Sequence, residues 1–247
     1  MLKKALAALF VAAACAASAA AAPTLRVGLE PTFQPFEFVD SHTKQYVGYD
    51  IDMVRAAAKH AGYDVKISNM GFDGLIPALM TGNIDVIASG MTITEERAKK
   101  VSFTKPVYRS SQVLLINKSS AKSVKSEKDL QGKDVCVQIG TIGADKAKEI
   151  PGAKVKNFNT VPDAYLELRN HGCTAVLLDT PVIEYFLKQK ASRGMMEVKT
   201  SYPAEDMGFA VKKGNKKLLD ALNKALDQME KSGEAKKIHA KWFQSAK

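Results

Sequence analysis

Short apolar segments alternate with amphipathic segments along most of the chain. Short apolar runs are typical of buried strands, whereas apolar positions three or four residues apart are typical of helices that cover a sheet. The expected strands are 25–29, 36–39, 46–48, 65–67, 84–88, 135–138, 155–158, 175–178, 195–198 and 208–211. The expected helices are 50–61, 75–80, 144–149, 161–171 and 218–229, followed by a short helix that carries Trp242 and Phe243. This alternation predicts an α/β fold with parallel strands.

The strand–helix–strand pattern occurs twice. One series ends with the strand 84–88, and the other begins with the strand 135–138. The segment 117–128 between them is polar and rich in Ser and Lys, as expected for a surface loop. The chain therefore predicts two α/β units. In such units ligands bind at the carboxyl ends of the strands and in the cleft between the units.

The first residues have the pattern of an export signal. Two lysines precede an apolar, Ala-rich stretch at 5–17, and small residues follow as far as Ala21. This order is typical of a cleavable signal peptide, which we assign to residues 1–22, and it predicts export to a periplasm. Because Pro23 blocks cleavage directly before itself, we expect the cut after Ala19 or Ala21.

Two alternatives to simple cleavage stay open. A membrane anchor would need a more hydrophobic run than this Ala-rich stretch, with a charged flank after it. A lipid attached to Cys15 would usually have Leu three residues upstream, where Ala12 stands. No later stretch is long and apolar enough to span a membrane, so we expect the mature chain to be soluble.

Export also decides how the other two cysteines are interpreted. In an oxidising compartment a pair such as Cys136 and Cys173 normally forms a disulfide. A metal site would need more ligands than two cysteines and four dispersed histidines provide. A cysteine nucleophile would need a nearby base, and the local sequence suggests none. We therefore predict a disulfide between the two.

Composition and charge exclude several classes of function. The chain has 247 residues, 46% of them hydrophobic and 25% charged, as in soluble globular proteins. The formal net charge is +10, but the lysines are scattered and no nucleic-acid-binding motif accompanies them, so we expect no nucleic-acid partner. No nucleophile elbow, zinc-protease motif or phosphate-binding loop occurs. We therefore expect a protein that is not an enzyme and needs no cofactor.

Two charged residues stand at or soon after the ends of predicted strands. Arg97 follows the strand 84–88, in the first turn of a helix that Thr94 would cap, and its guanidinium can hold a carboxylate with two hydrogen bonds. The alternative is a surface arginine paired with a neighbouring glutamate. Asp179 ends the strand 175–178 and could hold an ammonium group. Its alternative role is to cap the helix that begins at Thr180 and Pro181.

Other residues at strand ends carry weaker signals. Gly140 and Thr141 place backbone N–H groups near a helix start, which suits an anion, although most such loops are only tight turns. Phe33 and Phe72 either pack in a core or line an apolar slot for a ligand. Glu30 is the acidic residue nearest the end of the first strand. Taken together, the opposite charges suit a zwitterionic ligand.

Several longer motifs follow one another along the chain. They are Pro35-Phe36-Glu37-Phe38, Val47-Gly48-Tyr49-Asp50-Ile51-Asp52, Phe72-Asp73-Gly74-Leu75-Ile76-Pro77-Ala78-Leu79, Gly82-Asn83-Ile84-Asp85, Gly90 through Arg97, and Phe103-Thr104. In this order they closely resemble the motifs of the family 3 periplasmic solute-binding proteins, the polar-amino-acid receptors of ABC importers. The resemblance covers residues 25–243, and the segments 179–181 and 241–243 look like those of the glutamine-binding branch.

The resemblance implies a two-lobed, flytrap-like α/β fold, each lobe a doubly wound sheet with helices on both faces. Lobe 1 would contain residues 24–108 and 206–247, and lobe 2 would contain residues 109–205. A hinge of two connecting strands would let the lobes close over a ligand. The implied partners are a small polar amino acid and the membrane permease of an ABC importer, and the receptor would be a monomer.

The resemblance also implies a role for individual residues. The α-carboxylate of the ligand would lie on Arg97, Thr92 and the backbone of Thr141 and Ile142. The α-ammonium would lie on Asp179 and the Gly90 carbonyl. The side chain would lie between Phe33 and Phe72, and its far end against Glu30 and Gln138.

Two departures from the glutamine-binding pattern affect the far end. Glutamine receptors typically carry Asp where this chain has Glu30, and Lys where it has Gln138. A positive charge is lost while a carboxylate is kept, which favours arginine, lysine, histidine or glutamine over the acidic amino acids. Ile142 also replaces a small residue, which would trim the pocket.

Two functional alternatives remain. Cyclohexadienyl dehydratases share the fold, and there a pocket carboxylate acts as general acid on a prephenate-like substrate. Such a dianion would require cations that Glu30 and Gln138 do not supply. The other alternative is a receptor that presents its ligand to a membrane sensor.

Overall fold

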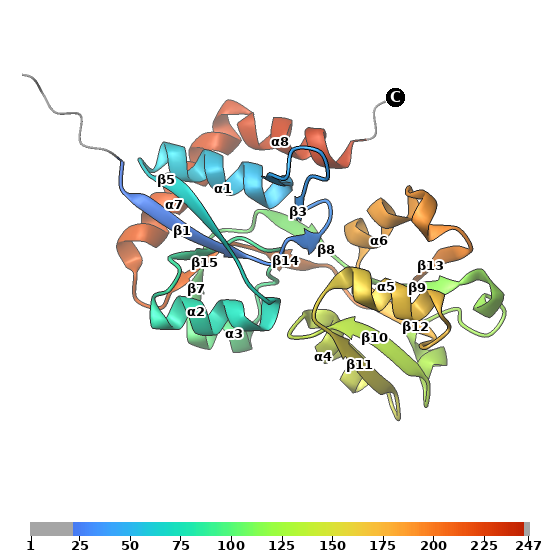
Figure 1. Ribbon diagram of the computed structural model, residues 1–247. Helices are drawn as coiled ribbons and strands as arrows, with labels where there is room; N and C mark the ends of the chain where they lie inside the picture. Colours follow the sequence, from blue (N-terminus) through green and yellow to red (C-terminus); the bar gives the residue numbers. More distant parts are fainter. Residues whose placement is uncertain (1–21, 245–247) are drawn as a thin grey trace, which may run out of the picture.

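The chain forms two α/β lobes side by side (Figure 1). The structure is a computed structural model that describes residues 22–244. Nearly all of the predicted signal peptide, with Cys15, lies outside the described residues. Within residues 22–244 no helix has the length and hydrophobicity that a bilayer crossing requires. The two-lobed α/β fold that the sequence predicts is confirmed.

The first lobe is built on a five-stranded sheet with the order β5-β1-β6-β15-β7. Figure 1 shows α1, α7 and α8 on one side of this sheet and α2 and α3 on the other. Its strands are β1 (Thr24–Leu29), β5 (Asp64–Asn69), β6 (Val86–Ile87), β7 (Val101–Phe103) and β15 (Ala210–Lys212). Its helices are α1 (Tyr49–His60), α2 (Leu75–Thr81), α3 (Glu95–Lys100), α7 (Lys216–Ser232) and α8 (Glu234–Phe243), and a small three-stranded sheet, β2 (Thr32–Phe33), β3 (Glu37–Val39) and β4 (Tyr46–Val47), lies at its edge.

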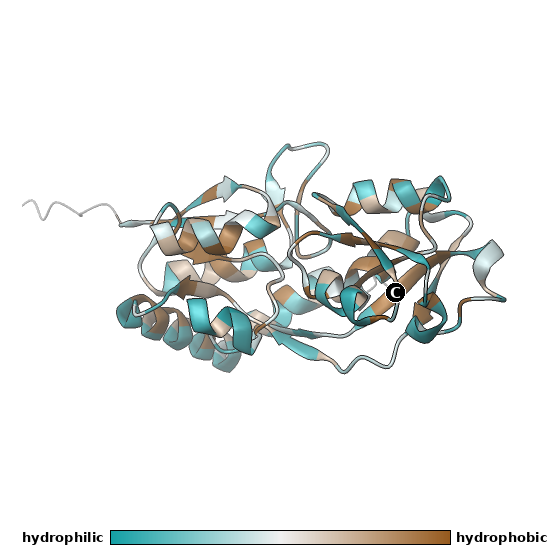
Figure 2. Ribbon diagram, turned by 90° about the horizontal axis from the view of Figure 1, so that it is seen from below, coloured by the Kyte–Doolittle hydropathy of each residue, from teal (hydrophilic) through white to brown (hydrophobic). Residues whose placement is uncertain are grey.

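The second lobe has the strand order β11-β10-β12-β9-β13. Alternate residues of its strands face opposite helices: Val135 and Val137 pack with α4, whereas Cys136 packs with α5 and α6. Both faces are therefore covered, and Figure 2 shows the central strands as the more hydrophobic layer. The strands are β9 (Gln112–Asn117), β10 (Asp134–Gln138), β11 (Lys154–Phe158), β12 (Ala175–Asp179) and β13 (Met195–Lys199). The helices are α4 (Ile142–Glu149), α5 (Val161–Arg169) and α6 (Thr180–Leu187).

The chain passes between the two large sheets through a two-stranded ribbon. β8 (Tyr108–Ser110) leads into the second sheet and β14 (Glu205–Met207) leads back, and the two pair in antiparallel register with Arg109 opposite Asp206. The ring of Tyr108 lies 4.6 Å from that of Phe243, so the C-terminal helix α8 packs against the ribbon.

The sheets differ from the predicted parallel ones in one respect. β15 runs antiparallel to β6 and β7, and β9 runs antiparallel to β12 and β13. Each of these strands follows directly on a crossing of the ribbon, so it enters its sheet from the hinge side. The remaining pairs, such as β1 with β5 and β10 with β11, are parallel as predicted.

Most predicted helices and strands are present with small shifts at their ends. The helix predicted at 161–171 ends at Arg169, and the strand predicted at 84–88 is only Val86–Ile87. The predicted surface loop 117–128 contains two short 3-10 turns, η2 (Lys118–Ser120) and the start of η3 (Glu127–Leu130).

The predicted disulfide is confirmed. Cys136 on β10 is bonded to Cys173, which directly precedes β12, and their Cα atoms lie 6.1 Å apart. β10 and β12 are neighbours in the sheet, so the bond ties two adjacent strands at one end. The second series, expected to begin with the strand 135–138, begins one strand earlier with β9, so β10 is the second strand of its sheet in chain order.

Candidate functional site

Eight of the ten residues predicted to bind a ligand line one small cavity between the lobes. They come from loops and helix starts at the ends of strands, as expected for an α/β fold. The cavity leaves about 10 Å³ to the centre of a water molecule, so it holds about one water and its walls must part to admit an amino acid. The eight residues are Phe33, Phe72, Gly90, Thr92, Arg97, Thr141, Ile142 and Asp179.

Arg97 projects from the first turn of α3 into the cavity. Thr94 caps this helix as predicted, because its hydroxyl accepts a hydrogen bond from the Arg97 N–H (3.2 Å). The guanidinium donates to the carbonyl oxygens of Thr92 (2.8 Å) and Gly140 (3.0 Å), and it lies 5.6 Å from the centre of the Phe72 ring. Gly140 belongs to the other lobe, so Arg97 bridges the cleft.

Burial changes the electrostatics of Arg97. Its removal from water lowers the pKa of the guanidinium, and the nearby carboxylates, chiefly Asp145 and Asp179, act in the opposite direction. Within residues 22–244 no carboxylate forms an ion pair with it, so the alternative of a surface arginine held by Glu95 or Glu96 is wrong. A half-buried cation in this position can accept an anionic group with a strong hydrogen-bonded pair.

Asp179 stands at the N-cap position of α6, but its side chain makes no capping hydrogen bond. The side chain is buried (4% exposed) and lines the cavity. Burial raises its pKa to about 6, while Gln112 and Ser110 stabilise the charged form. The carboxylate is therefore directed to the cleft and not used to start the helix.

Gly90 is held in a conformation that requires glycine. Its φ of +52° is in the left-handed region, and a Cβ atom there would stand 2.9 Å from the Phe33 ring. The Gly90 N–H donates to the Asp50 carboxylate (2.7 Å), which fixes the peptide against α1. Thr141 caps α4 through its side chain, so it belongs to the first turn of that helix, next to Ile142.

Glu30 and Gln138, the other two predicted residues, do not line this cavity, and they contact each other across the cleft. Gln138 Nε2 donates to Glu30 Oε2 (2.8 Å) and to the carbonyl of Asn159 (3.1 Å). Thr32 donates to the same Glu30 oxygen (2.7 Å). Gln138 Oε1 is buried and has no hydrogen-bond partner among the described residues.

The Glu30 carboxylate is buried (5% exposed). Burial raises its pKa, and the hydrogen bonds from Thr32 and Gln138 oppose that change. In the described part of the chain no Lys, Arg or His forms an ion pair with it. The far end of the site thus presents two acceptors, one of them a carboxylate, without a cation of its own.

The sequence of residues 25–245 matches the pattern of the bacterial extracellular solute-binding proteins, family 3. The chain belongs to this family. The "Arginine-binding extracellular protein ArtP" of Bacillus subtilis is 35% identical over 90% of this chain and 87% of its own length. The "Probable histidine-binding protein" of Neisseria gonorrhoeae is 35% identical over 92% of this chain and 87% of its own.

A solved structure of a similar protein has the same fold as this chain. "An ancestral arginine-binding protein bound to arginine" is 43% identical, covers 90% of this chain and 99% of its own, and superposes with a TM-score of 0.86. The likeness therefore extends over both lobes and the cleft between them.

In this family member, several buried polar residues behind the cleft were not identified from the sequence as site residues. The Ser89 hydroxyl donates to Glu37 (2.8 Å) and accepts from the Glu30 N–H (3.0 Å). Burial, and then the neighbouring carboxylate of Asp50, raise the pKa of Glu37 well above its usual range. Burial raises the pKa of Asp50 to about 7. For Glu37 and Asp50 the sequence signal was an acidic side chain between two apolar neighbours.

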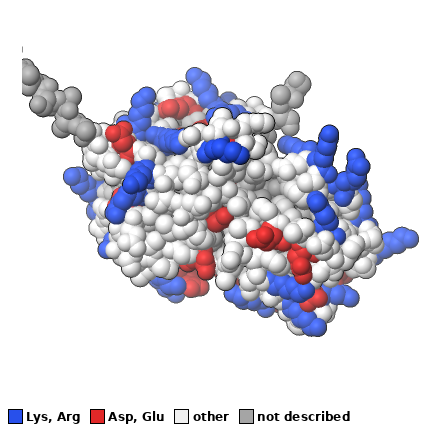
Figure 3. All heavy atoms as spheres, viewed as in Figure 1, with Lys and Arg blue, Asp and Glu red and all other residues white. Residues whose placement is uncertain are grey.

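Charge is unevenly distributed on the face that Figure 3 shows. Acidic side chains gather near the boundary between the lobes and over α5, whereas Lys and Arg lie mostly toward the outer edges. Within residues 22–244 no group of three His, Cys, Asp or Glu side chains is arranged to hold a metal ion.

Proposed function

We propose that this chain is an exported receptor that binds arginine in the cleft and delivers it to the permease of an ABC importer. The observation that carries the proposal is the buried Glu30 carboxylate, which has no cationic partner among the described residues, beside the unpartnered Gln138 Oε1. A guanidinium offers five N–H donors in one plane and a positive charge, so it satisfies both acceptors at once. The arginine named for one relative and for one solved structure supports this assignment.

The near end of the cleft suits the backbone of a free amino acid. Arg97 would hold the α-carboxylate together with Thr92 and the start of α4, and Asp179 would hold the α-ammonium with the Gly90 carbonyl. Phe33 and Phe72 would enclose the aliphatic part of the side chain. Two buried ion pairs, one at each charged group, replace the hydration that a zwitterion loses in a closed cleft.

Closure would take place about the β8–β14 ribbon. We propose lobe 1 as residues 24–108 and 206–247 and lobe 2 as residues 109–205, because both crossings lie at those boundaries. Opening would break the contacts that Arg97 makes with Gly140 and that Glu30 makes with Gln138, and would expose the ligand site.

The cellular setting follows from the family and from the N-terminal pattern. We propose a periplasmic monomer, released by a signal peptide, with a membrane permease as its protein partner. A dehydratase on this fold would need cations at the far end of the cleft, where this chain has Glu30 and Gln138.

Isothermal titration of the mature protein with the twenty amino acids and prephenate tests the proposal. We expect arginine to bind most tightly, lysine and histidine more weakly, and prephenate not at all. Arg97→Ala should abolish binding while the circular dichroism spectrum stays unchanged, whereas the exposed α1 variant Arg55→Ala should bind as the parent does. Binding of glutamine alone, or retention of affinity in Arg97→Ala, would contradict the proposal.

A further inference from the structure

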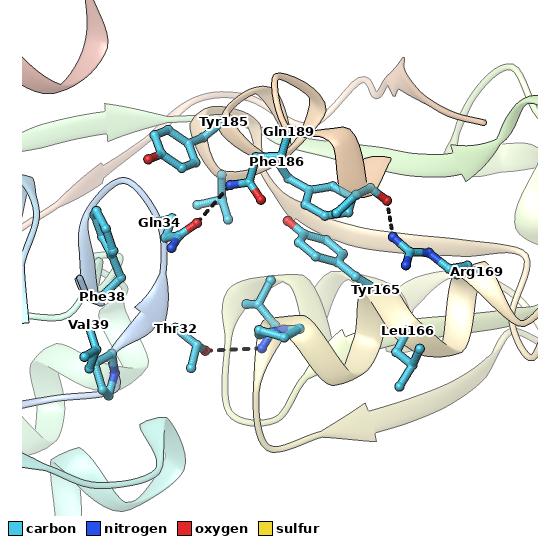
Figure 4. Close-up of a pocket in the computed structure, with 15 residues that line it drawn as sticks. Thr32, Gln34, Phe38, Val39, Tyr165, Leu166, Arg169, Tyr185, Phe186 and Gln189 are labelled. Atoms are coloured by element: carbon cyan, nitrogen blue, oxygen red, sulfur yellow. Dashed lines mark hydrogen bonds between the residues drawn. The ribbon is translucent and has the colours of Figure 1, made fainter. Parts of the chain in front are cut away.

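A second and larger cavity lies between the lobes, apart from the ligand site described above. Its volume is about 460 Å³, within the range of about 300–1,000 Å³ that is typical of small-molecule sites. One wall is the segment 31–39 of the first lobe, and the other is formed by α5, α6 and the residues that follow α6 (Figure 4).

Four aromatic side chains make the walls suitable for a flat ring. Tyr165 and Phe186 stack with their centres 4.0 Å apart on the second lobe. Phe38 of the first lobe faces Tyr185 of the second, with 6.3 Å between their ring centres. Offset or edge-on packing against such rings is favourable for another aromatic group.

The polar groups of the cavity favour an anion that accepts hydrogen bonds. Arg169 is the one charged side chain among its lining residues; it donates to the Ala191 carbonyl and keeps further N–H donors. The Tyr165 hydroxyl is buried without a partner among the described residues. Figure 4 shows it pointing from α5 toward Gln34 and Gln189, whose amides are hydrogen-bonded to each other (3.0 Å).

We propose that this cavity is a second binding site, for a small aromatic carboxylate. The ring would lie among the four aromatic side chains, and the carboxylate would bind Arg169 at the rim and the Tyr165 hydroxyl. Thr32 separates this site from the first one: its hydroxyl donates to Glu30 and accepts from the Val161 N–H (3.4 Å). The two ligands would therefore occupy separate sites.

Occupancy of the second site would favour closure, because its walls come from both lobes. A ligand that contacts both walls binds the closed arrangement better than the open one. By linkage, an amino acid in the first site must then raise the affinity of the second site by the same factor as the reverse. The second site goes beyond the proposed amino-acid transport and would tune how readily the receptor closes.

Titration calorimetry with phenylacetate and indole-3-acetate, first without amino acid, tests the cavity by itself. The neutral phenylacetamide tests the charge, and the non-aromatic cyclohexylacetate tests the ring. We expect both aromatic acids to bind at least tenfold more tightly than either control. Repetition with saturating arginine should raise their affinity about fivefold. A failure of arginine to bind would contradict only the proposed function, because the first titrations do not depend on it.

Variants of the lining residues complete the test. Arg169→Gln should weaken phenylacetate binding about tenfold, and the isosteric Tyr165→Phe about threefold. Arg55→Gln, an exposed arginine outside this cavity, should leave it unchanged. Absence of binding, equal binding of phenylacetamide, no effect of Arg169→Gln and Tyr165→Phe, or competition with arginine would each overturn the proposal.

Discussion

The charge of Glu30 should decide whether the receptor distinguishes arginine from citrulline. Citrulline has nearly the shape of arginine, but a neutral urea replaces its guanidinium. In Glu30→Gln the buried carboxylate is replaced by an amide of similar size. The change removes the charge and keeps a group that can still contact Thr32 and Gln138.

The size of the effect follows from the burial of the site. Glu30 is 5% exposed, so water screens its attraction to a bound cation only weakly. Removal of one partner of a buried, hydrogen-bonded charge pair costs about 3 kcal/mol, or roughly 150-fold in affinity. For citrulline the same substitution replaces a charged acceptor with a neutral one, but the neutral urea loses no charge–charge attraction, and we expect a change of about threefold or less.

Isothermal titration of both ligands against the parent and Glu30→Gln gives a thermodynamic cycle, and its coupling energy isolates the charge–charge contribution. Glu149→Gln, an exposed acid at the end of α4, is the matched control. Without ligand, Glu30→Gln should unfold at the same temperature as the parent or a higher one, because the free-energy cost of burying a charged carboxylate is removed. An unchanged ratio of arginine to citrulline affinity in Glu30→Gln would refute the assignment of Glu30 to the side-chain charge.

Three further predictions concern pH and the covalent bond. The pKa of Asp179 is about 6, and the α-ammonium of the ligand requires the ionised carboxylate. Arginine affinity measured by titration should therefore fall about tenfold from pH 8 to pH 5. In Asp179→Asn the affinity should be low at both pH values, and a pH dependence equal to that of the parent would contradict the assignment. Burial raises the pKa of Asp50 to about 7, so the folded protein binds a proton more tightly than the unfolded chain. Stability in urea should therefore decrease as pH rises from 5 to 8, by up to about 3 kcal/mol, and Asp50→Asn should flatten this decrease; an unchanged slope in that variant would contradict the assignment. The double variant Cys136→Ser and Cys173→Ser should lose about 4 kcal/mol of unfolding free energy, as expected for a closed loop of 37 residues; a loss below about 1 kcal/mol would show that the bond constrains little.

Much of the fold could be predicted because local patterns determine it. The run Ala175–Leu178 is buried along its whole length, and a short apolar run of this kind is typical of a central strand. The direction of β9 and β15 could not be predicted in this way. A strand has the same apolar pattern in either direction, and its orientation depends on where the chain enters the sheet after crossing the ribbon.

The residues of the candidate site could be predicted where a local pattern marks them, but their contacts with each other could not. Charged residues at strand ends and in the helix starts that follow strands, such as Asp179 and Arg97, are brought to one cleft by the topology of the sheets. Contacts across the cleft were beyond local patterns: Gln138 and Glu30 are 108 residues apart in sequence, and their hydrogen bond depends on how the lobes meet. The capping role of Asp179 also could not be separated from a binding role, because only the direction of its side chain decides between them.

Two of the hydrogen bonds between the lobes engage groups that are proposed to hold the ligand. Arg97 donates to Gly140, and Gln138 donates to Glu30, so each group proposed to hold one end of the ligand has a substitute partner on the opposite lobe. Binding is then an exchange of partners, and the net gain is smaller than a count of ligand contacts suggests, by about 1 kcal/mol for each bond. The same exchange in reverse lets the walls satisfy one another as the ligand departs. A receptor built in this way would give up some tightness of binding, and in return the cleft would keep its polar groups paired when it is empty.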